Sequence, residues 1–312
     1  MTALQTLLSR LVDYAGLFPP ASLPLPAVVG NYARYLEGGN RWMLGRLIVP
    51  ARQLGEFEET FQRLFPNAGG AAPWQISALI PGIDDRAAYD RALQTIDEFN
   101  NRFPSARVDT VEGKLSRADQ IDPLLASLPE SLTAFLEMPH NAYDTLIPRL
   151  ASAGRPTALA KIRTGGVTPD LIPDPDVVAG FVAACGETGL GFKATAGLHH
   201  PVRGVFPLTY DPQAEQALMH GFLNVFVAAC LVRAGLRDRA GLAEVLACRD
   251  PAAFRFQAES LEFAGRRIHR EEIAEIRRTF AVSFGSCSFT EPLEEIRRPG
   301  WLESNTSSAA PG

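Results

Sequence analysis

The chain has 312 residues, a hydrophobic fraction of 46% and a formal net charge of −5 at pH 7. This apolar content is typical of a globular protein and excludes a disordered chain, and the acidic balance offers no basic surface for nucleic acid. The four cysteines lack the paired spacing of a zinc site, and the N-terminus lacks a signal-peptide pattern. The longest apolar run is shorter than the roughly 20 residues that span a bilayer. We therefore expect a cytoplasmic protein with reduced thiols that binds neither nucleic acid nor membranes.

Short strand-like segments alternate with longer amphipathic stretches along the chain. The predicted strands are Leu11–Tyr14, Leu44–Val49, Gln75–Ile80, Arg107–Val111, Thr133–Glu137, Ala158–Ile162, Gly191–Ala194 and Ala281–Phe284. The predicted helices between them are Leu54–Leu64, Ala87–Phe99, Ala118–Ser127, Ala142–Ala153 and Asp176–Glu187. This alternation is typical of parallel βαβ units. Eight strands favour a closed α/β architecture, the (β/α)8 or TIM barrel, as a single domain over residues 1–303.

The regular alternation is interrupted before the last predicted strand. Residues from about 199 to 270 exceed what one crossover needs, which predicts an insertion that forms a lid or a subunit contact. Within it we expect a helix over Ala214–Ala234, a second helix over Ala240–Cys248 and a hairpin across Phe254–Ile268. The apolar first helix makes a homodimer a candidate assembly. Segment 66–73 is rich in Gly and Pro and is predicted to be a loop, and residues 304–312 are predicted to be a disordered tail.

Two lysines lie at the ends of neighbouring predicted strands, each just before a turn that contains glycine. Lys161 and Lys193 are 32 positions apart, the length of one strand–helix–strand unit. In a barrel, consecutive parallel strands would bring both ammonium groups to one mouth. Two nearby cations depress one another's pKa, and a neutral lysine is a nucleophile that forms Schiff bases with carbonyl compounds. The pair therefore predicts covalent chemistry on a carbonyl substrate.

Further polar residues occur near the carboxyl ends of the predicted strands, where barrel enzymes place their catalytic groups. They are Asp13, Asp109, Glu112, Glu137 and Arg163. An acid beside a Schiff-base lysine would suit the proton transfers of carbinolamine formation and dehydration. Asp109 and Glu137 could instead serve only as partners of arginines.

Six segments in chain order resemble deoxyribose-phosphate aldolase, a family of class I aldolases. The segments are Val12-Asp13-Tyr14, Arg107-Val-Asp109-Thr-Val, Phe135-Leu-Glu137, Lys161-Ile-Arg-Thr-Gly165, Gly191-Phe-Lys193-Ala-Thr-Ala-Gly197 and Ser283-Phe-Gly285-Ser-Cys-Ser288. In that family the fourth-strand aspartate is catalytic, the sixth-strand lysine forms the Schiff base and the seventh strand supplies a second lysine. The resemblance implies a (β/α)8 barrel and an aldolase-type lyase that needs no cofactor and no metal.

Carried over to this chain, the resemblance implies a role for each matched residue. Lys161 would form the Schiff base, Lys193 would lower its pKa, and Asp109 would move protons with Asp13 in support. The residues implied or expected to contact the substrate are Glu137, Arg163, Thr164, Gly165, Gly197, His199, Gly285, Ser286 and Ser288. The implied partner is a small carbonyl compound, and the sequence leaves open whether that compound is phosphorylated.

The chain departs from the family where a substrate phosphate would rest. Ala196 replaces the first of two seventh-strand glycines, Gly166 replaces a lysine, and Cys287 replaces a serine. A methyl group where backbone must approach an anion weakens such a phosphate site. The departures predict that the lysine pair is retained while the substrate has changed.

Two other functions remain open from the residues alone. Glu112, Glu137 and His199 could hold a divalent metal for enolate chemistry or hydrolysis, although the adjacent His199 and His200 would point to opposite sides of an extended chain. Alternatively, the barrel could be non-catalytic and bind a small anion or a protein partner. A lysine at a strand end is most often a solvated surface residue, and fold alone does not select among these functions.

Overall fold

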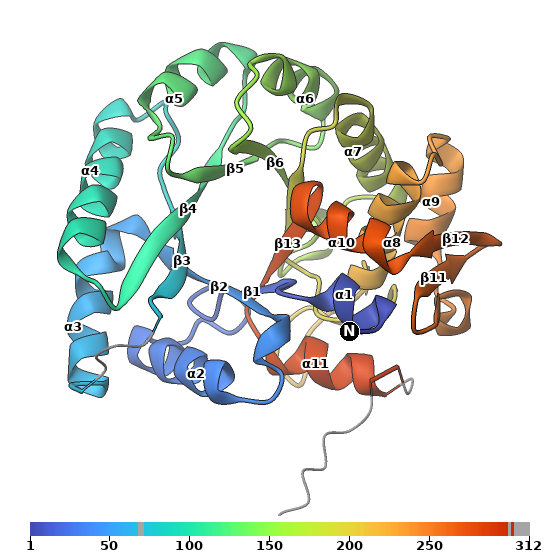
Figure 1. The fold of residues 1–312 in the computed structure, drawn as a ribbon, viewed down its shortest axis with the longest axis horizontal. Helices are drawn as coiled ribbons and strands as arrows, with labels where there is room; N and C mark the ends of the chain where they lie inside the picture. The colour runs from blue at the N-terminus through green and yellow to red at the C-terminus, as the bar shows by residue number, and fades with distance from the viewer. Residues whose placement is uncertain (68–71, 299–300, 303–312) are drawn as a thin grey trace, which may run out of the picture.

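Eight parallel strands close into a barrel around the centre of the molecule (Figure 1). The computed structural model describes residues 1–67, 72–298 and 301–302. The barrel strands are β1 (Val12–Tyr14), β2 (Leu44–Pro50), β3 (Trp74–Leu79), β4 (Ala106–Lys114), β5 (Thr133–Glu137), β6 (Ala158–Arg163), β7 (Phe192–Thr195) and β13 (Ala281–Ser286). Strand β1 pairs with β2 on one side and with β13 on the other, which closes the ring. The predicted TIM-barrel fold is confirmed.

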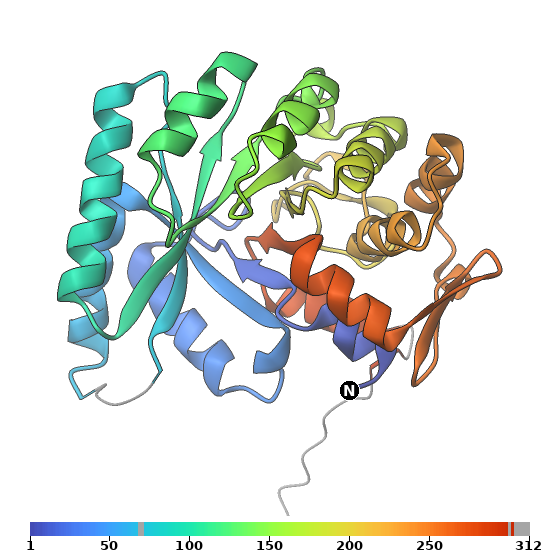
Figure 2. The same cartoon turned by 45° about the horizontal axis from the view of Figure 1, so that its top comes forward.

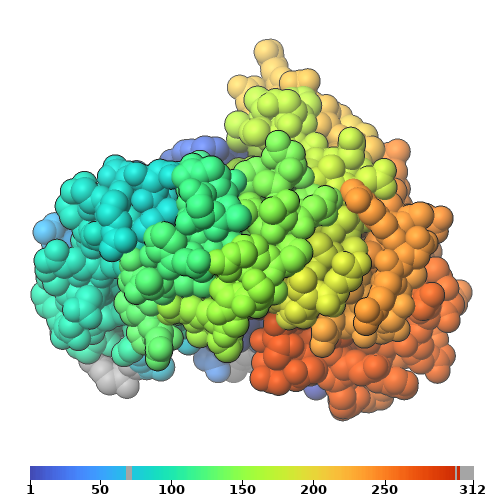
Figure 3. All heavy atoms as spheres, turned by 90° about the horizontal axis from the view of Figure 1, so that it is seen from above, coloured from blue at the N-terminus to red at the C-terminus, as the bar shows by residue number. Residues whose placement is uncertain are grey.

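Helices surround the barrel, as Figures 1 and 2 show. They are α1 (Ala3–Leu8), α2 (Leu25–Glu37), α3 (Leu54–Leu64), α4 (Arg86–Arg102), α5 (Ile121–Ser127), α6 (Tyr143–Ser152), α7 (Pro175–Thr188), α8 (Phe222–Arg233), α9 (Arg239–Ala247), α10 (Arg270–Thr279) and α11 (Thr290–Arg297). Seen from above, the segments coloured from cyan through green to yellow follow one another in chain order across one face (Figure 3). Successive βα units therefore lie side by side.

Helix α4 illustrates how the local sequence produces these elements. Asp85 caps its first turn, because the side chain accepts a hydrogen bond of 3.0 Å from the backbone N–H of Ala88. Tyr89, Ala92, Ile96 and Phe99 are buried at spacings of three and four residues, which places them on one face of the helix. The same periodicity predicts the helix from the sequence.

The segment between β7 and β13 contains the extra elements that the sequence predicts. It forms two small antiparallel sheets, β8 (Gly204–Pro207) with β9 (Gln216–Met219), and β10 (Arg255–Phe256) with β11 (Ser260–Phe263) and β12 (Arg266–His269). The predicted hairpin is confirmed as β11–β12. The predicted helix over Ala214–Ala234 is wrong at its start, because residues 216–219 pair with β8 and the helix begins only at Phe222.

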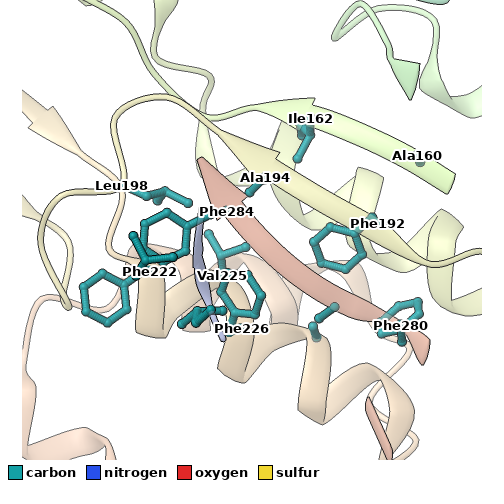
Figure 4. Packing of buried hydrophobic residues seen from close by; sticks show 14 of the residues in the cluster. Ala160, Ile162, Phe192, Ala194, Leu198, Phe222, Val225, Phe226, Phe280 and Phe284 are labelled. Atoms are coloured by element: carbon teal, nitrogen blue, oxygen red, sulfur yellow. The ribbon is translucent and has the colours of Figure 1, made fainter. Parts of the chain in front are cut away.

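Helix α8 is buried on all sides within the chain, so its apolar composition is explained without a subunit contact. Phe222 stacks on Phe284 of β13 with ring centroids 5.5 Å apart, and Phe226 lies 6.0 Å from the same ring (Figure 4). The amide of Asn224 donates to the carbonyls of Val245 and Cys248 at 2.8 Å, which ties α8 to α9. The homodimer stays a prediction.

Some sequence predictions fall on residues outside this description. The loop predicted at 66–73 is described only at its two ends, and the predicted tail over 304–312 lies outside the described residues. Within the described part of the chain, none of the helices combines the length and the hydrophobicity needed to cross a membrane.

Candidate functional site

A cavity of about 530 Å³ opens at the carboxyl ends of the barrel strands. Glu112, Glu137, Lys161 and Arg163 line it, together with residues from the turns that follow β1, β3, β6, β7 and β13. A second hollow of about 590 Å³ lies at the strand starts near Thr133, Ala158 and Gly191, and none of the chain's lysines lines it. The polar groups with catalytic potential therefore gather at the mouth where barrel enzymes react.

The two predicted lysines occupy the same buried pocket. They are paired in register across the neighbouring strands β6 and β7. The side chain of Lys193 is fully buried, and that of Lys161 is 5% exposed and contributes to the cavity wall. The prediction that the two lysines lie side by side on neighbouring strands is confirmed, but only Lys161 lines the cavity at the mouth of the barrel, whereas Lys193 does not.

Glu112 bridges the two lysines. Its Oε2 lies 2.9 Å from Nζ of Lys161, and its Oε1 accepts a hydrogen bond of 2.7 Å from Nζ of Lys193. Ser77 on the adjacent strand β3 donates a further hydrogen bond of 2.7 Å to Oε1. The carboxylate therefore separates two cations that would otherwise repel one another.

Asp13 holds Lys193 from the opposite side. Its Oδ2 accepts hydrogen bonds from Nζ of Lys193 at 2.5 Å and from the hydroxyl of Ser283 at 2.7 Å. Its Oδ1 accepts the backbone N–H of Arg46 at 2.7 Å. The amine of Lys193 thus contacts two carboxylates and lies 5.6 Å from the ring centroid of Phe135. These contacts fix the position of Lys193, which does not line the cavity.

Glu137 joins the buried cluster to the cavity mouth. Its Oε2 is 3.0 Å from Nζ of Lys161, and its Oε1 accepts a 3.2 Å hydrogen bond from Nε of Arg163. The side chain of Arg163 is 40% exposed. We name these six residues the lysine–carboxylate cluster: Asp13, Glu112, Glu137, Lys161, Arg163 and Lys193. Three cationic side chains balance three carboxylates, as buried charges require.

The balance of charges overturns one expectation about Lys161. Burial alone would lower its pKa, but the carboxylates of Glu112 and Glu137 outweigh burial and raise it above the ordinary value. The prediction that crowding by Lys193 removes the proton of Lys161 is therefore wrong for this arrangement. Burial would raise the pKa of Glu112, yet the two lysines hold it well below its usual range. The contacts within the cluster thus stabilise the charged forms of Glu112, Glu137 and Lys161.

Two turns after β6 and β7 pack against one another and shape the cavity edge. The hydroxyl of Thr164 donates to the carbonyl of Ala196 at 2.7 Å. Ala196 and Gly197 both adopt left-handed backbone conformations, with φ of 62° and 73°. Gly165 and Gly197 meet so closely that a Cβ on either would lie 2.9 Å from the Cα of the other. Thr164 and Gly165 thus hold the turn, while Gly197 reaches the cavity wall.

Replacing Gly197 by alanine is expected to destabilise the protein by about 1–3 kcal/mol, because the new methyl meets backbone at a left-handed position. Gly55→Ala is the matched control, since nothing lies within 4 Å of its Cβ position on α3. Urea denaturation followed by circular dichroism measures both. Equal denaturation midpoints for the two variants would contradict the proposed turn–turn contact.

The end of β13 and the turn that follows it contribute some residues to the cavity and others to the scaffold. Gly285 and Cys287 line the cavity, whereas Ser286 and Ser288 do not. The hydroxyl of Ser286 accepts the backbone N–H of Ser288 at 3.3 Å, and that of Ser288 accepts the N–H of Glu291 at 3.1 Å. Of the residues predicted here as substrate contacts, the structure brings Gly285 to the cavity and assigns the two serines to the turn.

His199 lies on the cavity wall, as expected of a substrate contact. Its Nδ1 is 2.9 Å from Oε2 of Glu291 on α11, at ion-pair distance but without a well-aligned hydrogen bond. Glu291 also accepts a hydrogen bond of 3.2 Å from the hydroxyl of Tyr210. The neighbouring His200 points elsewhere and stacks on Phe206, with centroids 3.4 Å apart.

Asp109 is not part of the lysine–carboxylate cluster. It forms an ion pair with Arg46, with Nε to Oδ1 at 2.6 Å, and does not line the cavity. The register of β4 skips this residue, since Ile76 pairs with Val108 and Ser77 pairs with Thr110. Such a bulge changes which side chains face the barrel interior. Glu112, three residues later, contacts the lysines in place of Asp109.

The metal hypothesis requires Glu112, Glu137 and His199 to converge. Among the residues that the structure describes, no three His, Cys, Asp or Glu side chains are arranged to hold a metal ion. Glu112 and Glu137 instead both contact Lys161. The donor set therefore does not fit a metal centre, and no step is derived through one.

Sequence reasoning missed the roles of Lys114 and Glu291. Lys114, the last residue of β4, lines the same cavity as Lys161. A signal was present in the composition: of the 30 lysines and arginines only three are lysines, and Lys114, Lys161 and Lys193 all belong to β4, β6 and β7 at one mouth. Glu291 gave no signal, because its contact with His199 spans 92 positions of sequence.

Fold and site together define the class of protein: a (β/α)8 barrel with a lysine–carboxylate cluster at a cavity that opens at the carboxyl ends of its strands. Searches with this sequence found no matching family model and no curated protein of significant similarity.

Proposed function

We propose that this protein is a carbon–carbon lyase of the class I aldolase type, which binds a small carbonyl substrate as a Schiff base on Lys161. The observation that carries the proposal is the placement of Lys161, a buried lysine that lines the cavity beside two carboxylates, Glu112 and Glu137, that contact its amine. The order of motifs that resembles deoxyribose-phosphate aldolase supports the same reaction type.

The scarcity of lysine strengthens the proposal. The chain uses arginine for nearly all its cationic positions, yet it places lysines at the end of β6 and within β7. Arginine remains protonated and cannot serve as a nucleophile, whereas lysine can lose its proton and attack a carbonyl. A buried charge pair alone would not require lysine, because arginine serves well in buried ion pairs.

The geometry supplies the proton transfers that the reaction requires. Glu112 or Glu137 accepts a proton from Lys161 as a carbonyl compound enters, and the neutral amine attacks the carbonyl carbon. The same carboxylic acid returns the proton to the carbinolamine hydroxyl, which leaves as water and yields the iminium ion. The iminium carries the positive charge that the ammonium carried before, so the carboxylates that stabilise one also stabilise the other.

The iminium then acts as an electron sink. When the bond between the α and β carbons breaks, its electron pair moves into the iminium and produces an enamine, and bond formation is the reverse. Several apolar side chains line the cavity above Lys161, namely Phe18, Ile48, Leu79, Val167 and Leu171. These apolar side chains favour a substrate with an apolar portion, which a small sugar phosphate lacks.

The test is reduction with borohydride in the presence of acetaldehyde, acetone, glycolaldehyde or pyruvate, followed by intact-mass measurement. We expect a covalent mass gain in the wild-type protein and in Lys114→Met, and none in Lys161→Met. Lys114 is the matched control because it lines the same cavity but is not part of the cluster. No adduct with any of the four compounds would overturn the proposal and favour a barrel that only binds its ligand.

A further inference from the structure

Among the residues that the structure describes, His199 is the histidine that lines the cavity, and the Schiff-base steps leave it without a role. It enters the cavity from a turn whose path is fixed by two left-handed residues and by the close contact of Gly197 with Gly165. The histidine residue is 7% exposed. A buried imidazole placed at a cavity by a rigid turn has the properties of a general acid–base.

Glu291 is positioned as the partner of this imidazole. It lies in the first turn of α11, where its backbone N–H is held by the hydroxyl of Ser288. Its Oε2 lies 2.9 Å from Nδ1 of His199 and accepts the hydroxyl of Tyr210 at 3.2 Å. Contacts of this kind are often poorly aligned before substrate binds and tighten afterwards. A carboxylate at Nδ1 leaves Nε2 as the nitrogen that exchanges protons with a ligand.

We propose that His199, positioned by Glu291, is the catalytic acid–base that moves the α-carbon proton of the substrate bound to Lys161. This inference rests on the proposed Schiff base. Nε2 removes a proton from the carbon next to the iminium. The electron pair of that C–H bond forms a carbon–carbon double bond, while the C=N pair returns to nitrogen and gives the neutral enamine. The imidazolium later returns the proton to the same carbon.

The carboxylates near Lys161 are less suited to this step. Burial would raise the pKa of Glu112 and of Glu137, but their cationic partners lower both. A carboxylate of depressed pKa is a weak base towards a carbon acid, and general bases work best with a pKa near the working pH. We therefore assign the formation and hydrolysis of the Schiff base to the cluster, and the proton transfer at the α-carbon to His199.

The experiment separates Schiff-base formation from proton transfer at carbon. It uses whichever compound of the four gives the reduced adduct and has an exchangeable α-hydrogen. We measure its exchange with deuterium in D2O by NMR and, in parallel, the extent of borohydride trapping. His199→Asn is expected to slow enzyme-catalysed exchange by about 10²- to 10⁴-fold, with trapping on Lys161 within about twofold of wild type.

Two further variants control for structural effects. His200→Asn is matched, because the adjacent histidine is equally buried but stacks on Phe206 and does not line the cavity. This variant should catalyse exchange of the α-hydrogen at the wild-type rate, relative to the amount of adduct trapped on Lys161. Glu291→Gln should slow exchange by about tenfold while trapping persists, since a positioning residue acts through the imidazole.

The outcomes distinguish the two proposals. Exchange at the wild-type rate in His199→Asn, with trapping retained, would overturn the role of His199 and leave the Schiff base in place. An equal loss of exchange in His200→Asn would also overturn it, because the effect would then be one of packing. Failure of the wild-type protein itself to form an adduct would overturn both.

Discussion

Glu112→Gln is expected to lower the free energy of unfolding by about 3–5 kcal/mol, because removing one member of a buried ion pair leaves uncompensated charge. The carboxylate contacts both lysines and the Ser77 hydroxyl, and its side chain is 1% exposed. The neutral amide leaves Lys161 and Lys193 to repel one another in a buried site. Urea denaturation of the variant beside wild type measures the loss.

Glu130→Gln is the matched control, since Glu130 is an exposed glutamate outside the barrel interior and surface substitutions change stability by about 0.5 kcal/mol or less. A loss for Glu112→Gln no larger than that of the control would contradict a charge cluster in the core.

The lowered pKa of Glu112 predicts how the stability of the protein changes at acidic pH. The pKa of Glu112 is lower in the folded protein than its ordinary value of 4.5. Its contribution to stability is therefore complete above pH 4.5 and is lost as the pH falls through the folded-state pKa. Glu112→Gln should lose less stability on acidification than wild type. If the free energies of unfolding of the two proteins fell in parallel as the pH is lowered, the lysines would not be lowering the pKa of Glu112.

Lys193→Met should have a comparable effect, a loss of about 3–5 kcal/mol, because it leaves Asp13 without its cationic partner and Glu112 with Lys161 alone. Adding Asp13→Asn removes the charge left without a partner, so the double variant should recover part of the loss. A double-mutant cycle should give a coupling energy between Asp13 and Lys193 of about 0.5–3 kcal/mol. Additive losses would mean that the buried contact of 2.5 Å contributes nothing specific.

The barrel could be predicted because its elements have strong local signals. Every predicted barrel strand overlaps an observed one, and Thr133–Glu137 and Leu54–Leu64 agree at both ends. Helix α8 was harder to delimit, because residues 216–219 continue its apolar pattern but pair with β8. Pairing between distant segments leaves no mark on local periodicity, and it decides where such an element begins.

The site was predictable in part. Spacing alone places Lys161 and Lys193 on adjacent strands, and it brings Asp13 and Glu137 to the same mouth. It could not choose between Asp109 and Glu112, because the choice depends on a bulge that the register reveals. The pKa of Lys161 also depends on three-dimensional contacts: two carboxylates at 2.9 and 3.0 Å outweigh the effect of burial.

Peptide mapping of the borohydride-reduced protein tests the central claim most directly. The account predicts that the substrate-derived mass resides on the peptide that contains Lys161, and that it appears there before any modification of Lys114 or of the N-terminal amine. An adduct located mainly on Lys114, or the absence of one from Lys161 at saturating carbonyl concentration, would contradict it.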